Sequence, residues 1–326
     1  MKILILTHAE VTELLTMREC IAVMEEALAA LDRGEAHQPL RMIVTPPGAA
    51  GDMALMPAYR SGQNYGVKVV CFFPDNPAKG LDSHQGSVML FSGATGELMA
   101  VMNASAITAI RTAAVSGVAT RLLARRDANE LAIIGSGVQA RAHIEAMACV
   151  RPIKRARIAS RRIESAKRFA EDLRAKCSFP IEASESVEKA VRGADIVVTA
   201  STAEQPILKR EWIAPGAHLN VVGSSIPSTR EIDSETMAAA SLFVDRREST
   251  MNEGGDYLFA MREGLIGPDS IRAEIGQLLT GRHPGRVARD EITLFKSLGL
   301  AVEDLASARF LYDKAQRLNA GSWVDY

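Results

Sequence analysis

The sequence predicts an α/β fold in two parts, a doubly wound parallel sheet and a separate strand-rich α+β domain. Three observations support this prediction. An apolar strand at residues 131–134 runs into a glycine-rich turn and then into a helix. Further strands alternate with helices after that turn, which is typical of a parallel sheet. Residues 41–103 instead show strand after strand without helices between them.

The amino-terminal part is expected to open with a short apolar strand at residues 1–6. Thr16 and Glu19 then form a capping-box signature, and apolar residues recur at helical spacing until Gly34. The small side chains of residues 104–124 predict a closely packed helix that leads into the second domain. Five strands are expected before it, the last two as a hairpin, at residues 41–45, 53–57, 66–73, 85–91 and 98–102.

The glycine-rich turn at residues 135–140 reads GSGVQA. Gly135 permits a tight turn, and Gly137 lets the backbone approach a pyrophosphate closely. The helix expected at residues 141–149 then presents its N–H groups and its positive dipole end to that anion. This strand–turn–helix context predicts a Rossmann-type dinucleotide-binding domain.

The end of the next strand, at residues 155–159, indicates which dinucleotide binds. NAD-binding folds usually place a carboxylate at this position to hold the ribose 2′-hydroxyl. This chain has Ser160, Arg161 and Arg162 there. A serine and two guanidiniums would bind a 2′-phosphate that a carboxylate would repel, so we predict NADPH or NADP+ rather than NADH or NAD+. The alternative is that the arginines only begin an exposed helix, which is expected to run to residue 173.

Three further parallel strands are expected at residues 194–201, 216–223 and 241–245. Strand ends in such sheets line the cofactor crevice, so Ser201, Gly223 and Ser225 are candidates by placement. Residues 291–314 alternate apolar and polar side chains at helical spacing. They predict one long helix that returns to pack on the amino-terminal domain.

Three isolated cations stand in apolar surroundings. Lys68 lies within an expected strand, where a charge must be partnered or must line a cleft. Arg41 and Arg111 could each offer a planar fork to a carboxylate or phosphate. The alternatives are a lysine that extends to the outer face of its strand and two ordinary surface ion pairs.

Composition restricts the function. The chain has 326 residues and a formal net charge of −1, so neither nucleic acid nor an anionic membrane is an expected partner. The apolar start is too short for a signal segment or a membrane span. Cys20, Cys71, Cys149 and Cys177 are scattered without a CxxC pair, which predicts reduced thiols in a cytoplasmic protein. No cluster with metal-ligand spacing occurs, so no metal is expected.

Five segments resemble the ornithine cyclodeaminase/μ-crystallin family, and the similarity covers nearly the whole chain. They are SHQG at 83–86, ITAIRTAA at 107–114, GSGVQA at 135–140, PSTRE at 227–231 and FKSLGLAVED at 295–304. The resemblance implies an NADP(H)-binding Rossmann domain at residues 119–298. It also implies a substrate-binding domain built from residues 1–118 and 299–326, which forms a homodimer through a shared sheet.

The resemblance also implies roles for single residues. The substrate carboxylate is expected against Arg41, Lys68 and Arg111, with Leu298 beside the substrate. The positions expected near the cofactor, to which we add Arg111 and the glycines, are Ser83, Arg111, Thr112, Gly135, Gly137, Val138, Gln139, Ser160, Arg161, Arg162, Ser201, Gly223 and Ser297.

Two departures from the family pattern favour one branch. Cyclodeaminases carry a glutamate where this chain has Ala54, and an aspartate that transfers protons where it has Ser225. Without that aspartate, deprotonation of an amine for ring closure is difficult. A serine at the position of Ser225 resembles the pattern of the ketimine reductase, μ-crystallin-like branch of the family.

The predicted activity is therefore a reaction of amino-acid metabolism, the NADPH-dependent reduction of small cyclic ketimines. The expected substrates are Δ1-pyrroline-2-carboxylate and Δ1-piperideine-2-carboxylate, which give proline and pipecolate. Arg41 and Arg111 would hold the substrate carboxylate, and Lys68 would protonate or hydrogen-bond the imine nitrogen. Ser225 would hydrogen-bond the substrate or a water molecule.

Three alternatives remain open at this point. One is an alanine-type dehydrogenase that acts on an open-chain keto acid with ammonia or an amine. Another is a lyase, either an ornithine cyclodeaminase or a hydroxyproline dehydratase. The third is a non-catalytic protein that binds a small molecule in the presence of NADPH. Cofactor oxidation with a ketimine alone distinguishes the reductase from all three.

Overall fold

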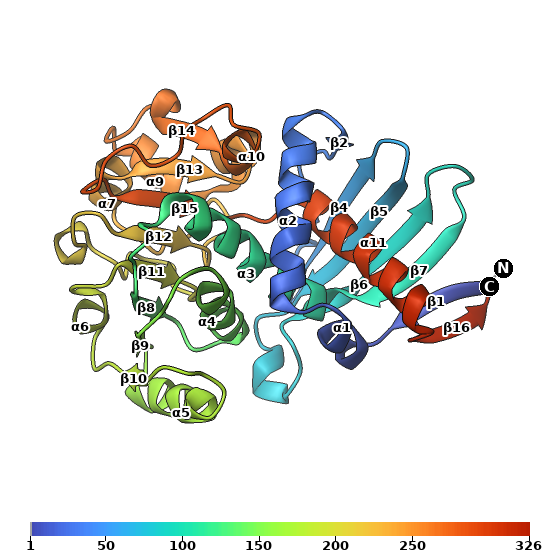
Figure 1. Ribbon diagram of the computed structural model, residues 1–326, viewed down its shortest axis with the longest axis horizontal. Helices are drawn as coiled ribbons and strands as arrows, with labels where there is room; N and C mark the ends of the chain where they lie inside the picture. The colour runs from blue at the N-terminus through green and yellow to red at the C-terminus, as the bar shows by residue number, and fades with distance from the viewer. Residues whose placement is uncertain (1) are drawn as a thin grey trace. The chain divides into compact units, whose positions relative to one another are not determined.

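The computed structural model describes residues 2–326, which divide into two compact units (Figure 1). The first unit comprises Met1–Thr112 and Gly299–Tyr326, and the second comprises Ala113–Leu298. The sequence prediction drew the corresponding boundaries after residues 118 and 298. The mixed α/β class is confirmed, and each unit contains one eight-stranded sheet.

The first unit is built on a mostly antiparallel sheet. Its strand order is β16-β1-β7-β6-β5-β4-β2, in which β2 pairs with the last residues of β4 and β3 pairs with its first residues. The two chain ends meet in this sheet, because β1 pairs with β16 antiparallel and with β7 parallel. The hairpin expected about residues 92–96 is confirmed as β6 and β7. The strands are β1 (Lys2–Leu6), β2 (Ala36–His37), β3 (Met42–Val44), β4 (Asp52–Arg60), β5 (Asn64–Phe72), β6 (His84–Ser92), β7 (Leu98–Asn103) and β16 (Ser322–Asp325).

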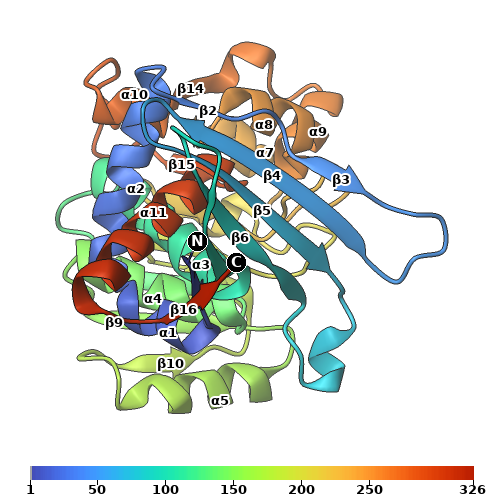
Figure 2. The ribbon, with the colours of Figure 1, turned by 90° about the vertical axis from the view of Figure 1, so that its right-hand side faces the viewer.

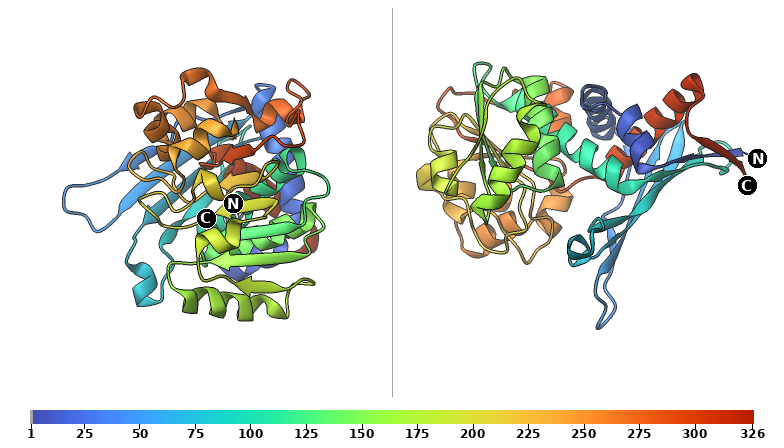
Figure 3. Two further views of the ribbon diagram at one scale, coloured as in Figure 1. Left: turned by 90° about the vertical axis from the view of Figure 1, so that its left-hand side faces the viewer. Right: turned by 90° about the horizontal axis from the view of Figure 1, so that it is seen from below.

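Helices cover one face of this sheet and leave the other face open (Figures 2 and 3). The capping box predicted at Thr16 and Glu19 is present, and α2 begins directly after it. Helix α11 packs on α2 and on β4, β5 and β6. The helices are α1 (His8–Leu14), α2 (Met17–Asp32), the short 3-10 helix η1 (Asn76–Lys79), α11 (Ala301–Leu318) and the first part of α3 (Ala104–Leu123).

The second unit is a doubly wound parallel sheet, as predicted. Its strand order is β10-β9-β8-β11-β12-β15-β13-β14, and every pairing is parallel. The strand order reverses between β8 and β11, which is where such folds bind their ligands. The strands are β8 (Glu130–Ile134), β9 (Arg155–Ala159), β10 (Ile181–Ala183), β11 (Ile196–Thr199), β12 (His218–Val221), β13 (Ser241–Val244), β14 (Ile271–Glu274) and β15 (Thr293–Lys296).

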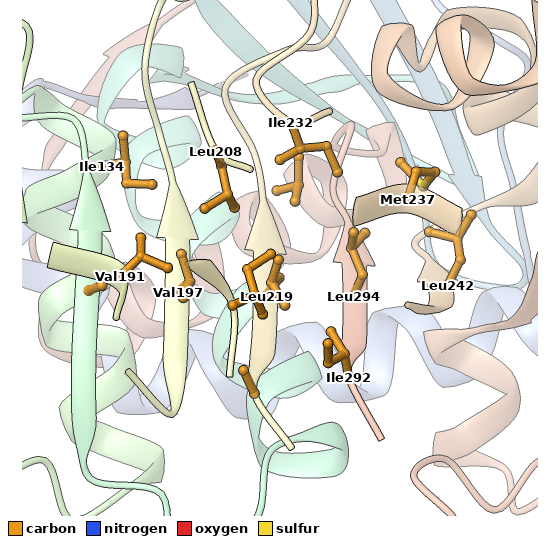
Figure 4. Close-up of a cluster of buried hydrophobic side chains, with 14 of the residues drawn as sticks. Ile134, Val191, Val197, Leu208, Leu219, Ile232, Met237, Leu242, Ile292 and Leu294 are labelled. Carbon is orange, nitrogen blue, oxygen red and sulfur yellow. The ribbon is translucent and has the colours of Figure 1, made fainter. Parts of the chain in front are cut away.

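A cluster of apolar side chains on one face of this sheet forms much of its core (Figure 4). Ile134, Val197, Leu219 and Leu294 come from the four neighbouring strands β8, β11, β12 and β15, and all are at most 2% exposed. The helices are α4 (Val138–Val150), α5 (Ile163–Arg174), α6 (Val187–Val191), α7 (Ser234–Ala239), α8 (Arg247–Glu253), α9 (Gly255–Arg262) and α10 (Ile275–Leu279), with 3-10 helices η2 (Arg210–Trp212) and η3 (Pro268–Ser270).

The single long helix predicted at residues 291–314 is wrong in its first part. Thr293–Lys296 is strand β15, and α11 begins only at Ala301. All four residues of β15 are buried between β12 and β13, so both faces of the strand are covered. A short strand buried on both faces lacks polar alternation and resembles the start of an apolar helix.

Helix α3 (Ala104–Leu123) is long and apolar enough to cross a membrane by length and composition alone. However, 72% of its apolar window is buried inside the protein, which is typical of the core helix of a soluble protein. The small side chains noted in the sequence explain this burial, because they allow close contact with neighbouring backbone.

Candidate functional site

The first group of candidate residues lies in the first unit and centres on Lys68. This lysine is in the middle of β5, opposite Met56 of β4 and Val88 of β6. Its side chain is only 3% exposed, and its Nζ lies 2.8 Å from Oδ2 of Asp304. Thr108 accepts a longer hydrogen bond from the same Nζ at 3.5 Å. Lys68 is therefore a buried, partnered charge rather than a lysine that extends to the surface.

Arg111 shares the same acidic partner. Its Nε donates to Oδ1 of Asp304 at 3.1 Å, and its Nη1 donates to Oε2 of Glu303 at 2.8 Å. The side chains of Arg111, Glu303 and Asp304 are all at most 5% exposed. The two oxygens of Asp304 thus hold one cation each, and the carboxylate joins β5, α3 and α11.

Arg41 joins this group through the start of α11. It lies before β3, and its Nη2 donates to the carbonyl oxygen of Gly299 at 3.2 Å. Gly299 has a φ of +81°, and a Cβ there would lie 2.4 Å from Nη1 of Arg111. The positive φ and the close approach of the Arg111 guanidinium therefore both favour glycine at this turn. The structure thus brings together the three predicted carboxylate-binding residues Arg41, Lys68 and Arg111.

Burial and neighbouring charges set the protonation states of this cluster. Burial, together with the nearby charge of Arg111, lowers the pKa of Lys68 to about 8. Burial opposes ionisation of Asp304, but Arg111 and Lys68 hold the pKa of its carboxyl below its usual range. Burial and the charges of Lys68 and Arg111 also lower the pKa of His84. The cluster therefore offers fixed cations for an anion and a lysine that can release its proton near neutral pH.

The second group of candidates lies in the second unit, at the turn between β8 and α4. Gly135 has a φ of +127°, and a Cβ there would lie 2.3 Å from the carbonyl oxygen of Ala200. Gly137 has no heavy atom within 4 Å of the place its Cβ would occupy. It is also the N-cap of α4 and supplies no side-chain hydrogen bond to that helix end. This open cradle with uncapped N–H groups fits the pyrophosphate of a dinucleotide.

Ser160, Arg161 and Arg162 lie between the end of β9 and the start of α5, as predicted. The Ser160 hydroxyl is 3.0 Å from that of Ser136 in the glycine turn. Arg161 and Arg162 are exposed. Among residues 2–326, neither guanidinium forms an ion pair or a side-chain hydrogen bond. Both guanidiniums are thus available for an anion near the glycine turn.

Glu231 organises the carboxyl ends of β11 and β12. It is fully buried and accepts hydrogen bonds from the Thr199 hydroxyl at 2.7 Å and from the Gly223 N–H at 2.7 Å. The N–H and hydroxyl of Ser201 donate to its other oxygen at 2.7 and 2.6 Å. Burial, and the nearby charge of Asp256, raise the pKa of this carboxyl. Glu231 therefore fixes the positions of Ser201 and Gly223.

A buried ion pair supports the same strand ends. Nζ of Lys296, at the end of β15, lies 2.8 Å from Oδ2 of Asp256, and both side chains are 0% exposed. The other oxygen of Asp256 accepts from the backbone N–H of Glu231 at 2.7 Å. Lys296 also donates to the carbonyl oxygen of Ser224. The loop that carries Ser224 and Ser225 is therefore held to the end of the parallel sheet.

The remaining predicted residues lie on both units. Ser225 is half-buried, and Ser297 is 2% exposed at the end of β15. The N–H of Leu298 donates to Asp245 at 2.6 Å. Ser83 and the buried Thr112 belong to the first unit, whereas the exposed Val138 and the half-buried Gln139 begin α4 in the second. Within residues 2–326, no group of three or more His, Cys, Asp or Glu side chains could hold a metal ion.

Sequence reasoning did not select Glu303, Asp304, Glu231, Lys296 or Asp256. Glu303, Asp304 and Lys296 stand in the segment at 295–304 and Glu231 in the segment at 227–231, so both motifs contained them. The usable signal was the same as for Lys68, a charge within an apolar stretch that folding buries. Asp256 has no such signal, because its neighbours in sequence are not uniformly apolar.

Comparison with known proteins identifies the class and then the family. The doubly wound sheet with its glycine turn, joined to a unit with a buried cationic cluster, defines a dinucleotide-binding protein of the dehydrogenase type. The model of the ornithine cyclodeaminase/mu-crystallin family matches residues 1–319. The chain belongs to this family, and the predicted membership is confirmed.

The relatives carry reductase and dehydrogenase names. The chain is 40% identical over 297 residues to the ketimine reductase mu-crystallin of Mus musculus, covering 90% of this chain and 91% of the relative. It is 40% identical to the Thermococcus litoralis Delta(1)-pyrroline-2-carboxylate reductase, whose structure holds NADH and L-proline, with a TM-score of 0.96 and coverage of 99% and 100%. An archaeal alanine dehydrogenase dimer with bound NAD is 33% identical, with a TM-score of 0.94 and full coverage of both chains. These neighbours support a nicotinamide dinucleotide as the cofactor and agree with the predicted reductase branch.

Proposed function

We propose that this protein is an NADPH-dependent reductase of small cyclic ketimine carboxylates. Its substrates are Δ1-pyrroline-2-carboxylate and Δ1-piperideine-2-carboxylate, and its products are proline and pipecolate. The observation that carries this proposal is the buried Lys68–Asp304–Arg111 cluster with Arg41 beside it, in a chain whose relatives are named for this reaction. In this proposal the first unit binds substrate, and the second binds NADP(H).

The arginines bind the substrate carboxylate. Arg41 and Arg111 both approach the turn at Gly299, so two guanidiniums converge on one small region. Guanidiniums form paired, charge-assisted hydrogen bonds with a carboxylate, which fix its orientation as well as its position. An oriented carboxylate fixes the plane of the cyclic imine and thus the face of C2 that accepts hydride.

Lys68 supplies the proton. A protonated imine accepts hydride far more readily than a neutral one, so the nitrogen needs an acid beside it. The pKa of about 8 leaves Lys68 protonated at neutral pH, yet able to release its proton to a basic nitrogen. Asp304 restricts the Nζ position at 2.8 Å, so the ammonium group is already oriented before substrate arrives.

The bound reduced nicotinamide supplies the hydride, and the chain supplies binding and orientation for the cofactor. The cradle at Gly137 and the N-terminus of α4 take the pyrophosphate. The exposed, unpaired guanidiniums of Arg161 and Arg162, with Ser160, favour NADPH over NADH because they complement a 2′-phosphate. Ser201, Gly223 and Ser297 line the strand ends in this proposal.

The absence of an acid at two positions favours a reductase over a lyase. Ala54 and Ser225 stand where cyclodeaminases carry a glutamate and a proton-transferring aspartate. Ser225 is half-buried and follows Ser224, whose carbonyl Lys296 holds, and a serine hydroxyl cannot take a proton from an amine near neutral pH. The specific observation for a second candidate, an alanine-type dehydrogenase, is the likeness to the archaeal alanine dehydrogenase.

A homodimer in the cytoplasm completes the proposal. On the face of the first sheet that bears no helix, the exposed apolar side chains include Met42, Val44, Met53 and Tyr65. Such a broad apolar face is a protein-interaction surface. The four free thiols agree with a reducing compartment. Light scattering tests the assembly, and a monomer at working concentration contradicts it.

A substrate panel tests the activity. We expect steady NADPH oxidation with either cyclic ketimine alone, in a one-to-one ratio with the amino acid formed. Oxidation only with pyruvate and ammonia supports the alanine-type dehydrogenase instead. Ornithine turnover without net cofactor oxidation supports a lyase. Tight NADPH binding without turnover of any substrate supports the non-catalytic binding protein.

Lys68 variants test the mechanism within the same assay. Lys68→Arg keeps the positive charge but removes an acid that can dissociate near neutral pH, because a guanidinium does not deprotonate in proteins. We expect it to retain NADPH affinity and lose at least about 100-fold in kcat. Lys79→Arg, at an exposed lysine of the same unit, is the matched control and should have the activity of the wild type. Near-normal turnover of Lys68→Arg contradicts the proton-donor role.

A further inference from the structure

The charge balance around Lys68 is set by groups from several elements. The acidic members both come from the first turn of α11, where the helix dipole also favours them. The ionisable groups that face this cluster are Glu303 and Asp304 of α11, Arg111 of α3, Arg41 before β3, His84 of β6 and Cys20 of α2. Burial raises the pKa of the Cys20 thiol to about 12, and the pKa of His84 is lowered, so both are uncharged near neutral pH.

The charged members are therefore three cations and two carboxylates. With Lys68 protonated, the cluster carries one net positive charge, and with Lys68 neutral it carries none. A substrate with a single carboxylate balances the protonated cluster. Because the site is buried, an unbalanced charge is costly there, and the two events of proton binding and carboxylate binding must favour one another.

We propose that Asp304 is a positioning residue that couples binding of the substrate carboxylate to protonation of Lys68. The inference rests on the proposed function for its substrate. Asp304 is suited to this role because its two oxygens hold Nζ of Lys68 at 2.8 Å and Nε of Arg111 at 3.1 Å. The group that binds the carboxylate and the group that gives the proton thus share one partner and a fixed separation.

The coupling also affects product release. The π bond of C=N breaks as hydride forms the new C2–H bond, and the nitrogen takes the proton from Lys68. Lys68 is then neutral, so the cluster has lost the positive charge that balanced the carboxylate. The product is held less tightly until Lys68 regains a proton from solvent. Proton transfer therefore promotes product release by the same linkage that favoured substrate binding.

Proton uptake on ligand binding tests this coupling in the wild-type protein saturated with NADP+. The probe is pyrrole-2-carboxylate, a planar ring carboxylate without a reducible imine. A carboxylate close to Lys68 should raise the lysine pKa by about one unit or more. Near pH 8.5, calorimetry in buffers of different ionisation enthalpy should then show uptake of about half a proton per site. Binding without proton uptake overturns the inference.

Two neighbouring carboxylates provide matched variants. Asp304→Asn removes the anion in contact with Lys68, so the upper pH limit of kcat/KM should fall by about one unit or more. Asp304→Glu keeps the negative charge, so its upper pH limit should lie close to that of the wild type. Glu303→Gln removes an equal charge, but one that pairs with Arg111 at 2.8 Å, whereas Lys68 pairs with Asp304; it should move the limit by less than half as much. An unmoved limit in Asp304→Asn, or an equal shift in Glu303→Gln, overturns the inference.

The two proposals fail in different ways. If no ketimine is reduced but pyrrole-2-carboxylate binds with proton uptake, the proposed function fails and the coupling stands. If ketimines are reduced but binding takes up no proton, the function stands and the coupling fails. The calorimetry uses the wild-type protein, so it distinguishes these two outcomes even if Asp304→Asn does not fold.

Discussion

The proposed preference for NADPH rests on two exposed arginines, and reversing the charge of one tests it. In Arg161→Asp the change lies at the end of β9, on a side chain that has no ion pair within the described residues. The fold should therefore tolerate it. We expect NADPH to bind much more weakly and NADH to bind nearly as before, because only NADPH carries the 2′-phosphate.

The magnitude follows from two effects. Loss of one charge-assisted hydrogen bond to the phosphate costs about 1.5 kcal/mol, the lower end of the usual range, because Arg161 is exposed. The new carboxylate then repels a doubly charged phosphate about 4 Å away, which in water adds about 2 kcal/mol. Together these raise the Kd for NADPH roughly 300-fold.

Fluorescence titration of each reduced cofactor measures both dissociation constants. Arg168→Asp is the matched control, because it makes the same charge change at an exposed position of α5, the helix that follows Arg161. At about 0.1 M salt, charges beyond about 10 Å are largely screened, so the control should change the NADPH affinity less than about threefold. Equal weakening of NADPH and NADH by Arg161→Asp, or an equal effect of Arg168→Asp, refutes the assignment of the 2′-phosphate site.

Three further predictions concern the glycine turn, the cluster and the buried ion pair. Gly137→Ala should leave the melting temperature unchanged but weaken NADPH binding at least about tenfold, whereas Gly135→Ala should lower stability by about 2 kcal/mol or more in urea unfolding, since its φ is +127°. The kcat/KM for ketimine should be constant below a pH of about 8 and fall about tenfold per unit above it, since Lys68 must be protonated; a flat profile to pH 10 contradicts this. Lys296→Met should lower the free energy of unfolding by about 3–5 kcal/mol, because it leaves Asp256 buried without its partner, and adding Asp256→Asn should restore part of that loss. Denaturant titration measures this, and an unchanged midpoint for Lys296→Met contradicts it.

Local signals in the sequence were sufficient for most of the second unit. The apolar strand, the glycine turn and the following helix form one continuous segment, so their pattern could be recognised without knowledge of the fold. The capping box at Thr16 and Glu19 is likewise local, and it is present where the pattern placed it. Strand β15 was missed because both of its faces are buried and its length is only four residues.

The candidate site depends on contacts that no local pattern reveals. Lys68 was conspicuous as a charge among apolar residues, but its partner Asp304 lies at the other end of the chain. Alternation along β5 could not distinguish a lysine at the surface from one buried against α11. Only the return of the carboxyl-terminal helix to the first sheet pairs the two charges and explains why the pKa of Lys68 is lowered only to about 8.

Isotope transfer tests the central claim most directly. NADPH that carries deuterium at the transferable C4 position, incubated with Δ1-pyrroline-2-carboxylate and no ammonia, should yield proline with one deuterium at C2 and an equal amount of NADP+. Proline that lacks deuterium at C2, or no proline at all, contradicts direct hydride transfer to the imine carbon.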